Sequence, residues 1–159
     1  MPLKSPATTI GVISDTHGLL RPEALDALRG SDLILHAGDI GSPDILPALA
    51  TIAPVIAVRG NIDTNEWCQS IPETLVVEVG EAKLCLTHDR SKLTVDPVQE
   101  RCAAVISGHS HKPHNELVNG VLWFNPGSAG PRRFRLPIAV GRLYVTQNKI
   151  TGELLTLIR

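Results

Sequence analysis

Residues 9–17, Thr-Ile-Gly-Val-Ile-Ser-Asp-Thr-His, join a short β-branched run directly to two side chains that can bind a metal ion. An apolar run of this length, bounded by polar residues, is typical of a buried strand. A segment with helical periodicity follows at residues 22–29, with Pro22 at its first turn and Gly30 at its end. The order strand, polar loop and helix predicts the first unit of an α/β sheet.

The same unit repeats along the first half of the chain. Strands are expected at residues 32–37 and 55–58, with a helix at 44–51 between them. Such crossovers are right-handed and give a parallel sheet. From residue 74 the pattern changes to paired strands at 75–79 with 83–86, 117–118 with 121–124, and 138–145 with 150–158. Asn119-Gly120 is a strong hairpin signal. A helix at about 96–103 and a strand at 104–107 should interrupt these hairpins, and the second half should form a second sheet packed on the first.

Length and composition favour one globular domain, residues 1–159, with its core at about 9–159. The chain is 43% hydrophobic and 19% charged, which suits a packed core. Fifteen basic and sixteen acidic residues leave a net charge of −1, and only five residues are aromatic. A nucleic-acid-binding surface is therefore not expected, because such surfaces need positive charge or stacking side chains.

Several features predict a cytoplasmic protein. Residues 1–9 do not resemble a signal peptide and suggest a short lead-in. The most apolar stretch, residues 46–58, contains two prolines and falls short of the ~20 residues that span a bilayer, so no membrane association is expected. The three cysteines are isolated along the chain, which indicates neither a disulfide framework nor a thiolate zinc site.

Polar side chains follow five of the predicted strands at the point where each strand ends. They comprise two aspartates, one asparagine and four histidines: Asp15, His17, Asp39, Asn61, His88, His109 and His111. Ligands of α/β proteins gather at the carboxyl ends of strands. Oxygen and imidazole donors suit divalent cations, and the absence of cysteine argues against a purely structural zinc site.

Each of these residues also has an ordinary structural interpretation. An aspartate after a strand is often a turn former or helix cap, and Asn61 could simply tolerate a left-handed turn. A single histidine such as His88 is more often a hydrogen-bonded packing residue than a ligand. The joint occurrence of all seven at strand ends favours a metal site.

The series of motifs, Asp-x-His, Gly-Asp, Gly-Asn-x-Asp, a later His and Gly-His-x-His, resembles the calcineurin-like metallophosphoesterase superfamily. The stretches 35–41, 60–63 and 125–128 resemble the small bacterial and archaeal phosphodiesterases of the YfcE type within it. The resemblance extends from Ile10 to about Arg135. It implies a four-layer α/β/β/α sandwich of two mixed sheets flanked by helices.

The resemblance also implies roles for the seven residues. Asp15, His17 and His111 would hold one metal ion, Asn61, His88 and His109 a second, and Asp39 would bridge both. Two divalent cations are implied, Mn²⁺ in the first place, with Ni²⁺, Zn²⁺, Fe and Mg²⁺ as alternatives. Such a pair activates a bridging water as hydroxide for in-line attack on phosphorus. The candidate catalytic residues are Asp39, Asn61, His88 and Arg90.

Two departures from the family pattern bear on substrate range. Ile62 follows Gly60-Asn61, where many members have a histidine that can assist the leaving group, so slow turnover of esters with high-pKa alcohols is expected. Asp89 and Arg90 stand where the family usually has glycine and histidine after the ligand. Arg90 could contact phosphate or pair with Asp89.

Other polar residues allow two interpretations. The arginines of the loop, Arg132, Arg133 and Arg135, could bind phosphate or form a solvated surface. Asn125 could hydrogen-bond to the site or begin a turn. His36, inside a strand, is expected in the core, where it could orient the Asp39 region, and His114 is expected to be exposed without a role.

The sequence thus predicts a dinuclear metal-dependent phosphodiesterase acting on a small phosphate ester, and it leaves open whether the chain forms a homo-oligomer. The alternative is a non-catalytic metal-binding scaffold, as in the retromer subunit that shares this fold. A nuclease is a third, less favoured class, because the charge is near neutral.

Overall fold

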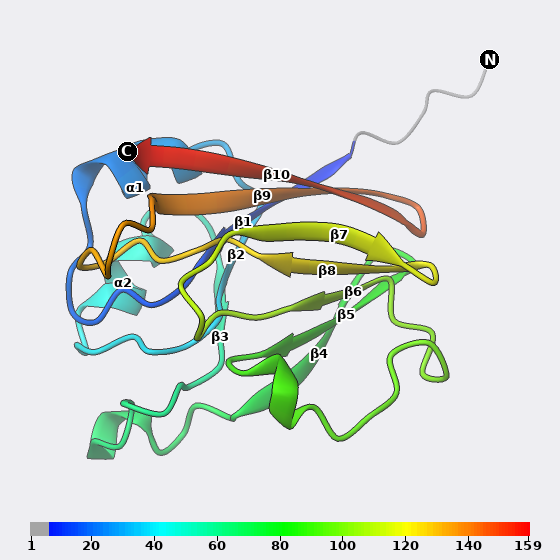
Figure 1. Cartoon of the computed structure of the whole chain (residues 1–159), viewed down its shortest axis with the longest axis horizontal. Coiled ribbons are helices and arrows are strands. Elements are labelled where there is room, and N and C mark those ends of the chain that lie inside the picture. Colours follow the sequence, from blue (N-terminus) through cyan, green and yellow to red (C-terminus); the bar gives the residue numbers. More distant parts are fainter. Residues whose placement is uncertain (1–6) are drawn as a thin grey trace.

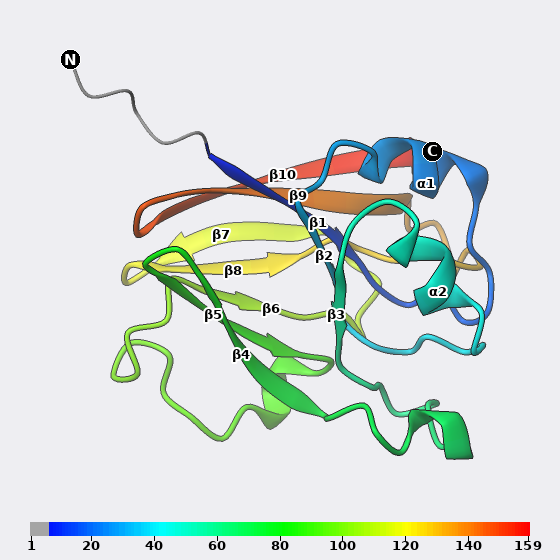
Figure 2. The same ribbon diagram turned by 180° about the vertical axis from the view of Figure 1, so that it is seen from behind.

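A computed structural model describes residues 7–159, so that residues 1–6 of the predicted lead-in lie outside the described part (Figures 1 and 2). Two five-stranded sheets stack face to face. The first has the order β10-β9-β1-β2-β3. Its members are β1 (Thr8–Ile13), β2 (Leu33–His36), β3 (Val55–Ala57), β9 (Ile138–Thr146) and β10 (Lys149–Ile158). β1, β2 and β3 run parallel, as predicted, and β9 pairs antiparallel with β1.

The second sheet has the order β4-β5-β6-β8-β7. Its members are β4 (Thr74–Val79), β5 (Ala82–Thr87), β6 (Ala104–Ile106), β7 (His114–Val118) and β8 (Val121–Asn125). β5, β6 and β8 are parallel, while β4 and β7 close antiparallel hairpins at the edges. At the β7–β8 turn Asn119 and Gly120 have φ of 52° and 80°, the left-handed pair that a tight two-residue hairpin needs.

The main core lies between the two sheets. Ile10, Leu35 and Leu143 from the first sheet pack with Leu84 and Ile106 from the second, all fully buried. The ring of Phe124 fills the space opposite two glycines of β9 and β10, Gly141 and Gly152, where a Cβ would collide with the ring. Backbone without side chains at these two positions lets the sheets close around a large aromatic residue.

A second core joins the first sheet to its helices. Ala24 and Leu28 of α1 (Pro22–Leu28) and Leu49 of α2 (Ile45–Ala50) pack with Ile13 and Ile34. Both helices begin within two residues of the predicted starts, and Figure 2 shows them together at one end of the molecule. The two mixed sheets and the helical layer confirm the predicted α/β fold.

The helix predicted at residues 96–103 is wrong. Turns occupy this segment, closed by the backbone bonds Glu100 N to Asp96 O and Cys102 N to Pro97 O. Arg101 has a φ of 59°, which ends the coil after a single turn, and Val98 points into solvent at 53% exposure. Because no apolar stripe faces the sheet, packing cannot hold a helix here. The outer face of the second sheet is covered by these turns and by the 3-10 turn η2 (Arg90–Lys92).

Within residues 7–159, no helix has the length and hydrophobicity that crossing a membrane requires.

Candidate metal centre

The seven predicted site residues follow the carboxyl ends of five strands in the two sheets. Asp15 and His17 follow β1, Asp39 follows β2, and His88 follows β5. Asn61, His109 and His111 follow β3 and β6 in the same way. Because the parallel strands of both sheets present these ends at one edge of the sandwich, residues up to 96 positions apart in the chain become neighbours.

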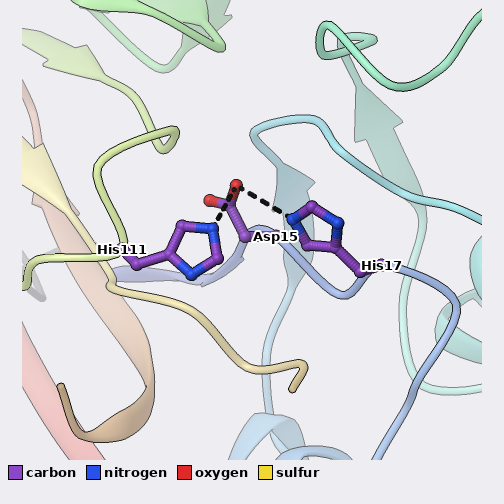
Figure 3. Close-up of side chains that lie close together, drawn as sticks. All are labelled: Asp15, His17 and His111. Atoms are coloured by element: carbon purple, nitrogen blue, oxygen red, sulfur yellow. Dashed lines mark ion pairs between the residues drawn. The ribbon is translucent and has the colours of Figure 1, made fainter. Parts of the chain in front are cut away.

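Asp15, His17 and His111 form the first group (Figure 3). Asp15 Oδ1 lies 3.3 Å from His111 Nε2 and 3.8 Å from His17 Nε2. One ligand atom from each of the three residues lies within 4.8 Å of the others. This is the set that the family resemblance implies for one metal ion.

Asp15, Asp39 and His88 form a second group with the same property. Asp39 Oδ2 lies 3.3 Å from His88 Nε2 and 3.5 Å from His17 Nε2, so that Asp39 stands between residues of both groups. Asp15 Oδ1 is also 4.0 Å from His88 Nε2. The structure therefore places two carboxylates, rather than Asp39 alone, between the imidazoles.

The remaining two predicted ligands lie at the rim of the cluster. His109 Nδ1 is 3.3 Å from His88 Nε2, and its side chain is 48% exposed. Asn61 is exposed and, with His88 and His109, lines a cavity of about 170 Å³ beside the cluster.

Arg90 lines a second cavity of about 450 Å³ together with His109, at the rim of the cluster. Its guanidinium lies 5.9 Å from the centre of the Trp123 ring, a cation–π contact on the outer face of the second sheet. The alternative pairing with Asp89 is not observed, because the Asp89 carboxylate accepts hydrogen bonds from the backbone and hydroxyl of Ser91. Asp89 also lies 3.8 Å from His109 Nε2.

The two central carboxylates remain ionised although they are buried. Burial by itself raises the pKa of Asp15, but the neighbouring imidazoles of His111 and His17 and the Ser14 hydroxyl hold that pKa far below its ordinary value. Burial likewise opposes ionisation of Asp39, and His88 together with the Ile62 N–H lowers its pKa. Two buried anionic groups are costly in free energy unless positive charge lies close to them.

Unpartnered ligand atoms point in the same direction. Among residues 7–159, Asp15 Oδ1 and His17 Nε2 are buried and form no hydrogen bond. A polar atom in this state is costly unless an ion or a water satisfies it. The residues therefore fit divalent cations, whose preferred donors are carboxylate oxygens and imidazole nitrogens.

The tautomer of His88 is fixed by the fold. Its Nδ1 lies 2.7 Å from the carbonyl oxygen of Ala37 and must donate a proton to it. Nε2 is then the nitrogen at which the ring gains or loses a proton, and it faces Asp39. Burial lowers the pKa of His88, but hydrogen bonding to Asp39 and the charge of Asp15 raise it above its ordinary value. A histidine oriented through its other nitrogen is typical of metal ligands.

Backbone strain is concentrated at these residues. Five of the seven have a positive φ although they are not glycine: Asp15 (55°), His17 (46°), Asp39 (56°), His109 (71°) and His111 (63°). Such conformations cost roughly 1–3 kcal/mol each and persist where the surrounding structure imposes them, often at functional sites. These strained backbone conformations therefore orient the five side chains toward the cluster at a cost in stability.

Glycines permit the close approach of the loops. A Cβ at Gly60 would collide with Asp39, and one at Gly108 would collide with Ser14 and approach Asp15 Oδ2 to 2.6 Å. The glycine of the Gly-Asn motif and that of the Gly-His-x-His motif are therefore required by the space around the two carboxylates.

His36 braces the loops from beneath, as the sequence suggested. Its Nδ1 accepts the Gly38 N–H at 3.1 Å, so Nε2 carries the proton that is donated to Thr16 Oγ1 at 3.0 Å. Thr16 in turn donates to the carbonyl oxygen of Ile40 at 2.8 Å. Complete burial lowers the pKa of His36 to about 4, which keeps the ring neutral. This chain of bonds ties the loop after β1 to the loop that carries Asp39.

Asp63 is the residue whose function the sequence did not reveal. Its buried carboxylate accepts N–H bonds from Ile40 (3.0 Å), Gly41 (3.1 Å) and Gly60 (2.8 Å), and thereby fastens the loop after β2 to the loop after β3. The spacing Gly-Asn-x-Asp was visible in the chain, but a carboxylate that binds backbone has no signature of its own.

The other predicted residues have mixed outcomes. Asn125 does both of the things expected of it: its Nδ2 donates to Gly108 O and Ser110 Oγ, and its Oδ1 accepts from Gly127 N.

The arginines of the loop lie at the surface. Arg132 donates to the carbonyl oxygens of Leu136 and Arg159, while Arg133 and Arg135 are exposed. His114 lies 3.3 Å from Glu116. Ile62 is 41% exposed, and its N–H donates to Asp39 Oδ1.

A sandwich of two mixed sheets with carboxylates and imidazoles gathered at the strand ends defines a metal-binding α/β protein. Residues 9–148 match the model of the calcineurin-like phosphoesterase superfamily domain, and the chain belongs to this superfamily. The motif series had predicted this membership.

Named relatives agree with that assignment. A probable metallophosphoesterase of Methanothermobacter thermautotrophicus is 37% identical over 158 residues, covering 92% of this chain and 91% of the relative. A structure described as a novel archaeal phosphodiesterase superposes with a TM-score of 0.76 at 26% identity, covering 92% of this chain and 99% of that one. Vacuolar Protein Sorting 29 from Cryptosporidium parvum shares the fold, with a TM-score of 0.78, 24% identity and coverage of 93% and 90%.

Proposed function

We propose that this protein is a dinuclear metal-dependent phosphodiesterase that hydrolyses small phosphate esters. The observation that carries the proposal is the pair of buried, ionised carboxylates Asp15 and Asp39 among four imidazoles, with unpartnered ligand atoms between them. Membership in the calcineurin-like phosphoesterase superfamily supports the reaction class.

The proposed ligand sets follow the two groups. Asp15, His17 and His111 would hold one cation, and Asn61, His88 and His109 the other, with Asp39 between them. The short distances from Asp39 to His17 and His88 support the bridging position. Mn²⁺ is the metal that we propose first, since this mixture of oxygen and imidazole donors accepts it readily.

When bound, the two cations supply Lewis-acid chemistry: they make water more acidic and offset the charge on phosphate oxygens. The chain supplies position. The Ile62 N–H and His88 fix the two oxygens of Asp39, and the carbonyl of Ala37 fixes the ring of His88. Arg90 stands over Trp123 and lines a cavity with His109, so we propose that it contributes to phosphate binding and not to the central step.

Two features of the chain support a small substrate. The cavity beside His88 and His109 is about 170 Å³ in volume. The net charge of −1 offers no broad cationic surface to a nucleic acid, so the positive charge that attracts a phosphate would come from the cations.

The test is hydrolysis of bis-p-nitrophenyl phosphate by metal-stripped protein with and without added Mn²⁺. Loss of an outer partner of a metal site costs about 10–100-fold, so Asp39→Ala should lower the Mn²⁺-dependent rate by at least about 100-fold. The matched control is Asp26→Ala, which removes an aspartate with a 74% exposed side chain from α1. It should retain the parent rate.

The alternative function is a metal-binding scaffold without catalysis. The scaffold is retained as an alternative because Vacuolar Protein Sorting 29 shares the fold. Tight Mn²⁺ binding without metal-stimulated hydrolysis, and an Asp39→Ala rate equal to that of the parent, would establish the scaffold and end the phosphodiesterase proposal.

A further inference from the structure

Two of the three cysteines meet in the structure although they are 17 positions apart in the chain. Cys85 lies on β5, and Cys102 lies just before β6, beneath the turns that cover the second sheet. Their Sγ atoms are 2.9 Å apart, and the residues are only 1% and 4% exposed. The third cysteine, Cys68, is also buried, but in residues 7–159 no sulfur lies beside it.

We propose that Cys85 and Cys102 are a redox modification site, at which a hydroperoxide joins the two thiols as an internal disulfide. A disulfide bond is ~2.05 Å long, so the sulfur atoms need to approach by only about 0.9 Å. The proposal is independent of the metal centre and of the proposed function.

A cavity gives a small oxidant access to Cys102. It has a volume of about 400 Å³ and lies among the turns of three hairpins, with Glu81, Gly120 and Asn148 in its lining. Cys102 lies at its wall, whereas Cys85 does not line it. Cys102 is therefore the thiol that meets the oxidant first.

Cys85 is suited to the second step. Burial, together with the neighbouring Cys102, raises the pKa of the Cys85 thiol to about 12, so that it stays protonated and unreactive toward dissolved oxidants. Its sulfur is nevertheless held against that of Cys102. Oxidation of Cys102 followed by attack of the adjacent Cys85 sulfur is the expected order.

The chemistry balances with the hydroperoxide as the only added reagent. The peroxide O–O bond breaks, its terminal oxygen joins the Cys102 sulfur, and an alcohol leaves, or water when the oxidant is hydrogen peroxide. The Cys85 sulfur then attacks the Cys102 sulfur. The S–S bond forms as the S–O bond breaks, and the hydroxide leaves as water with the Cys85 proton. Two thiols lose two electrons, and the peroxide gains them.

The disulfide would close a loop that contains part of the candidate site. Residues 86–101 lie between the two cysteines and include His88 and η2. Closing a loop of about 15 residues restricts the unfolded chain substantially, which for a domain of this size corresponds to a melting temperature raised by roughly 6–12 °C.

The experiment uses the full chain, first reduced and then treated with hydrogen peroxide. Remaining thiols are alkylated under denaturing conditions, and the protein is digested with trypsin. Cleavage after Lys83, Arg90 and Arg101 puts Cys85 and Cys102 on separate peptides. We expect one cross-linked pair carrying these two cysteines, an alkylated Cys68, reversal by dithiothreitol, and a higher melting temperature before reversal.

Variants separate the pair from general oxidation. Cys68→Ala should form the same cross-link, whereas Cys102→Ala and Cys85→Ala should form none. If the wild-type chain yields no Cys85–Cys102 cross-link under peroxide that oxidises its methionine, the proposal is overturned. A cross-link that fails to raise the melting temperature would show that the bond does not fit the native packing, and would also count against it.

Discussion

Replacing Asp63 with alanine should loosen the two loops that carry Asp39 and Asn61. The Asp63 carboxylate is buried at 4% exposure and accepts three backbone N–H groups, from Ile40, Gly41 and Gly60. Alanine has no acceptor, so all three donors lose their partner. The loops would then be held mainly by Thr16 and His36 on one side.

The expected magnitude follows from the count of donors. Each buried donor left unsatisfied costs about 1–3 kcal/mol, and water entering the partly buried rim would recover some of this. A loss of about 3–6 kcal/mol in the free energy of unfolding results. Domains are stable by about 5–15 kcal/mol, so the variant should remain folded but melt roughly 10–20 °C lower.

The assay is urea unfolding of metal-free protein followed by circular dichroism, together with calorimetric titration of Mn²⁺ into the folded variant. Mn²⁺ affinity should fall by about 10–100-fold, as for other residues that orient metal ligands. Asp63→Asn, which keeps one acceptor oxygen, should lie between the parent and Asp63→Ala. Asp26→Ala, with an exposed side chain, should change stability by less than ~0.5 kcal/mol.

Two results would refute this reasoning. A loss below ~1 kcal/mol in Asp63→Ala would show that the three hydrogen bonds contribute little. Undiminished Mn²⁺ affinity in a clearly destabilised variant would show that the loops keep their geometry without Asp63.

The remaining predictions concern His36, the leaving group and the inter-sheet core. Since the pKa of His36 is about 4 in the fold and ~6.5 in the unfolded chain, the unfolded state binds an additional proton between pH 4 and pH 6.5. Metal-free protein should therefore lose up to about 3 kcal/mol of stability as the pH falls from 6.5 to 4. In urea unfolding experiments, the free energy of unfolding of His36→Gln should change less steeply with pH than that of the parent. Because Ile62 stands where a histidine could assist the leaving group, an alkyl phosphodiester should turn over about 10²–10⁴ times more slowly than the nitrophenyl ester. Ile62→His should reduce this difference in rate, and equal rates for the two esters in the parent would contradict the prediction. Gly141→Ala should lower stability by about 1–3 kcal/mol in thermal melting, because the added Cβ collides with Phe124, and Phe124→Leu in the same chain should recover part of this loss. If the loss of stability in the double variant equals the sum of the losses in the two single variants, the collision is not the cause.

The polar residues at the strand ends could be identified from the sequence because their grouping is a consequence of strand order. Asp15 and Asp39 follow adjacent parallel strands, and parallel strands necessarily end at the same edge. Short-range signals were equally sufficient for the hairpin at Asn119-Gly120, because positive φ at two successive residues is a local property.

The failures occurred where long-range contacts decide local structure. Residues 96–103 contain enough apolar side chains for a helical pattern, but whether a helix forms depends on a surface to pack against. The role of Asp63 depends on its contact with the loop after β2, where Gly41 and Ile40 are 22 and 23 positions away in the sequence. The meeting of Cys85 with Cys102 likewise depends on how the chain returns to β6.

Periodicity, turn chemistry and motif order are enough to predict the α/β class, the superfamily and the residues that gather at one edge. Which atoms face one another is visible only in the folded chain. Asp15 as well as Asp39 lies between the imidazoles, Arg90 lies over Trp123, and backbone strain falls on the candidate ligands. The physical reason is that distances, burial and ionisation are set by the packing of both sheets together, and no local stretch of the chain contains that information.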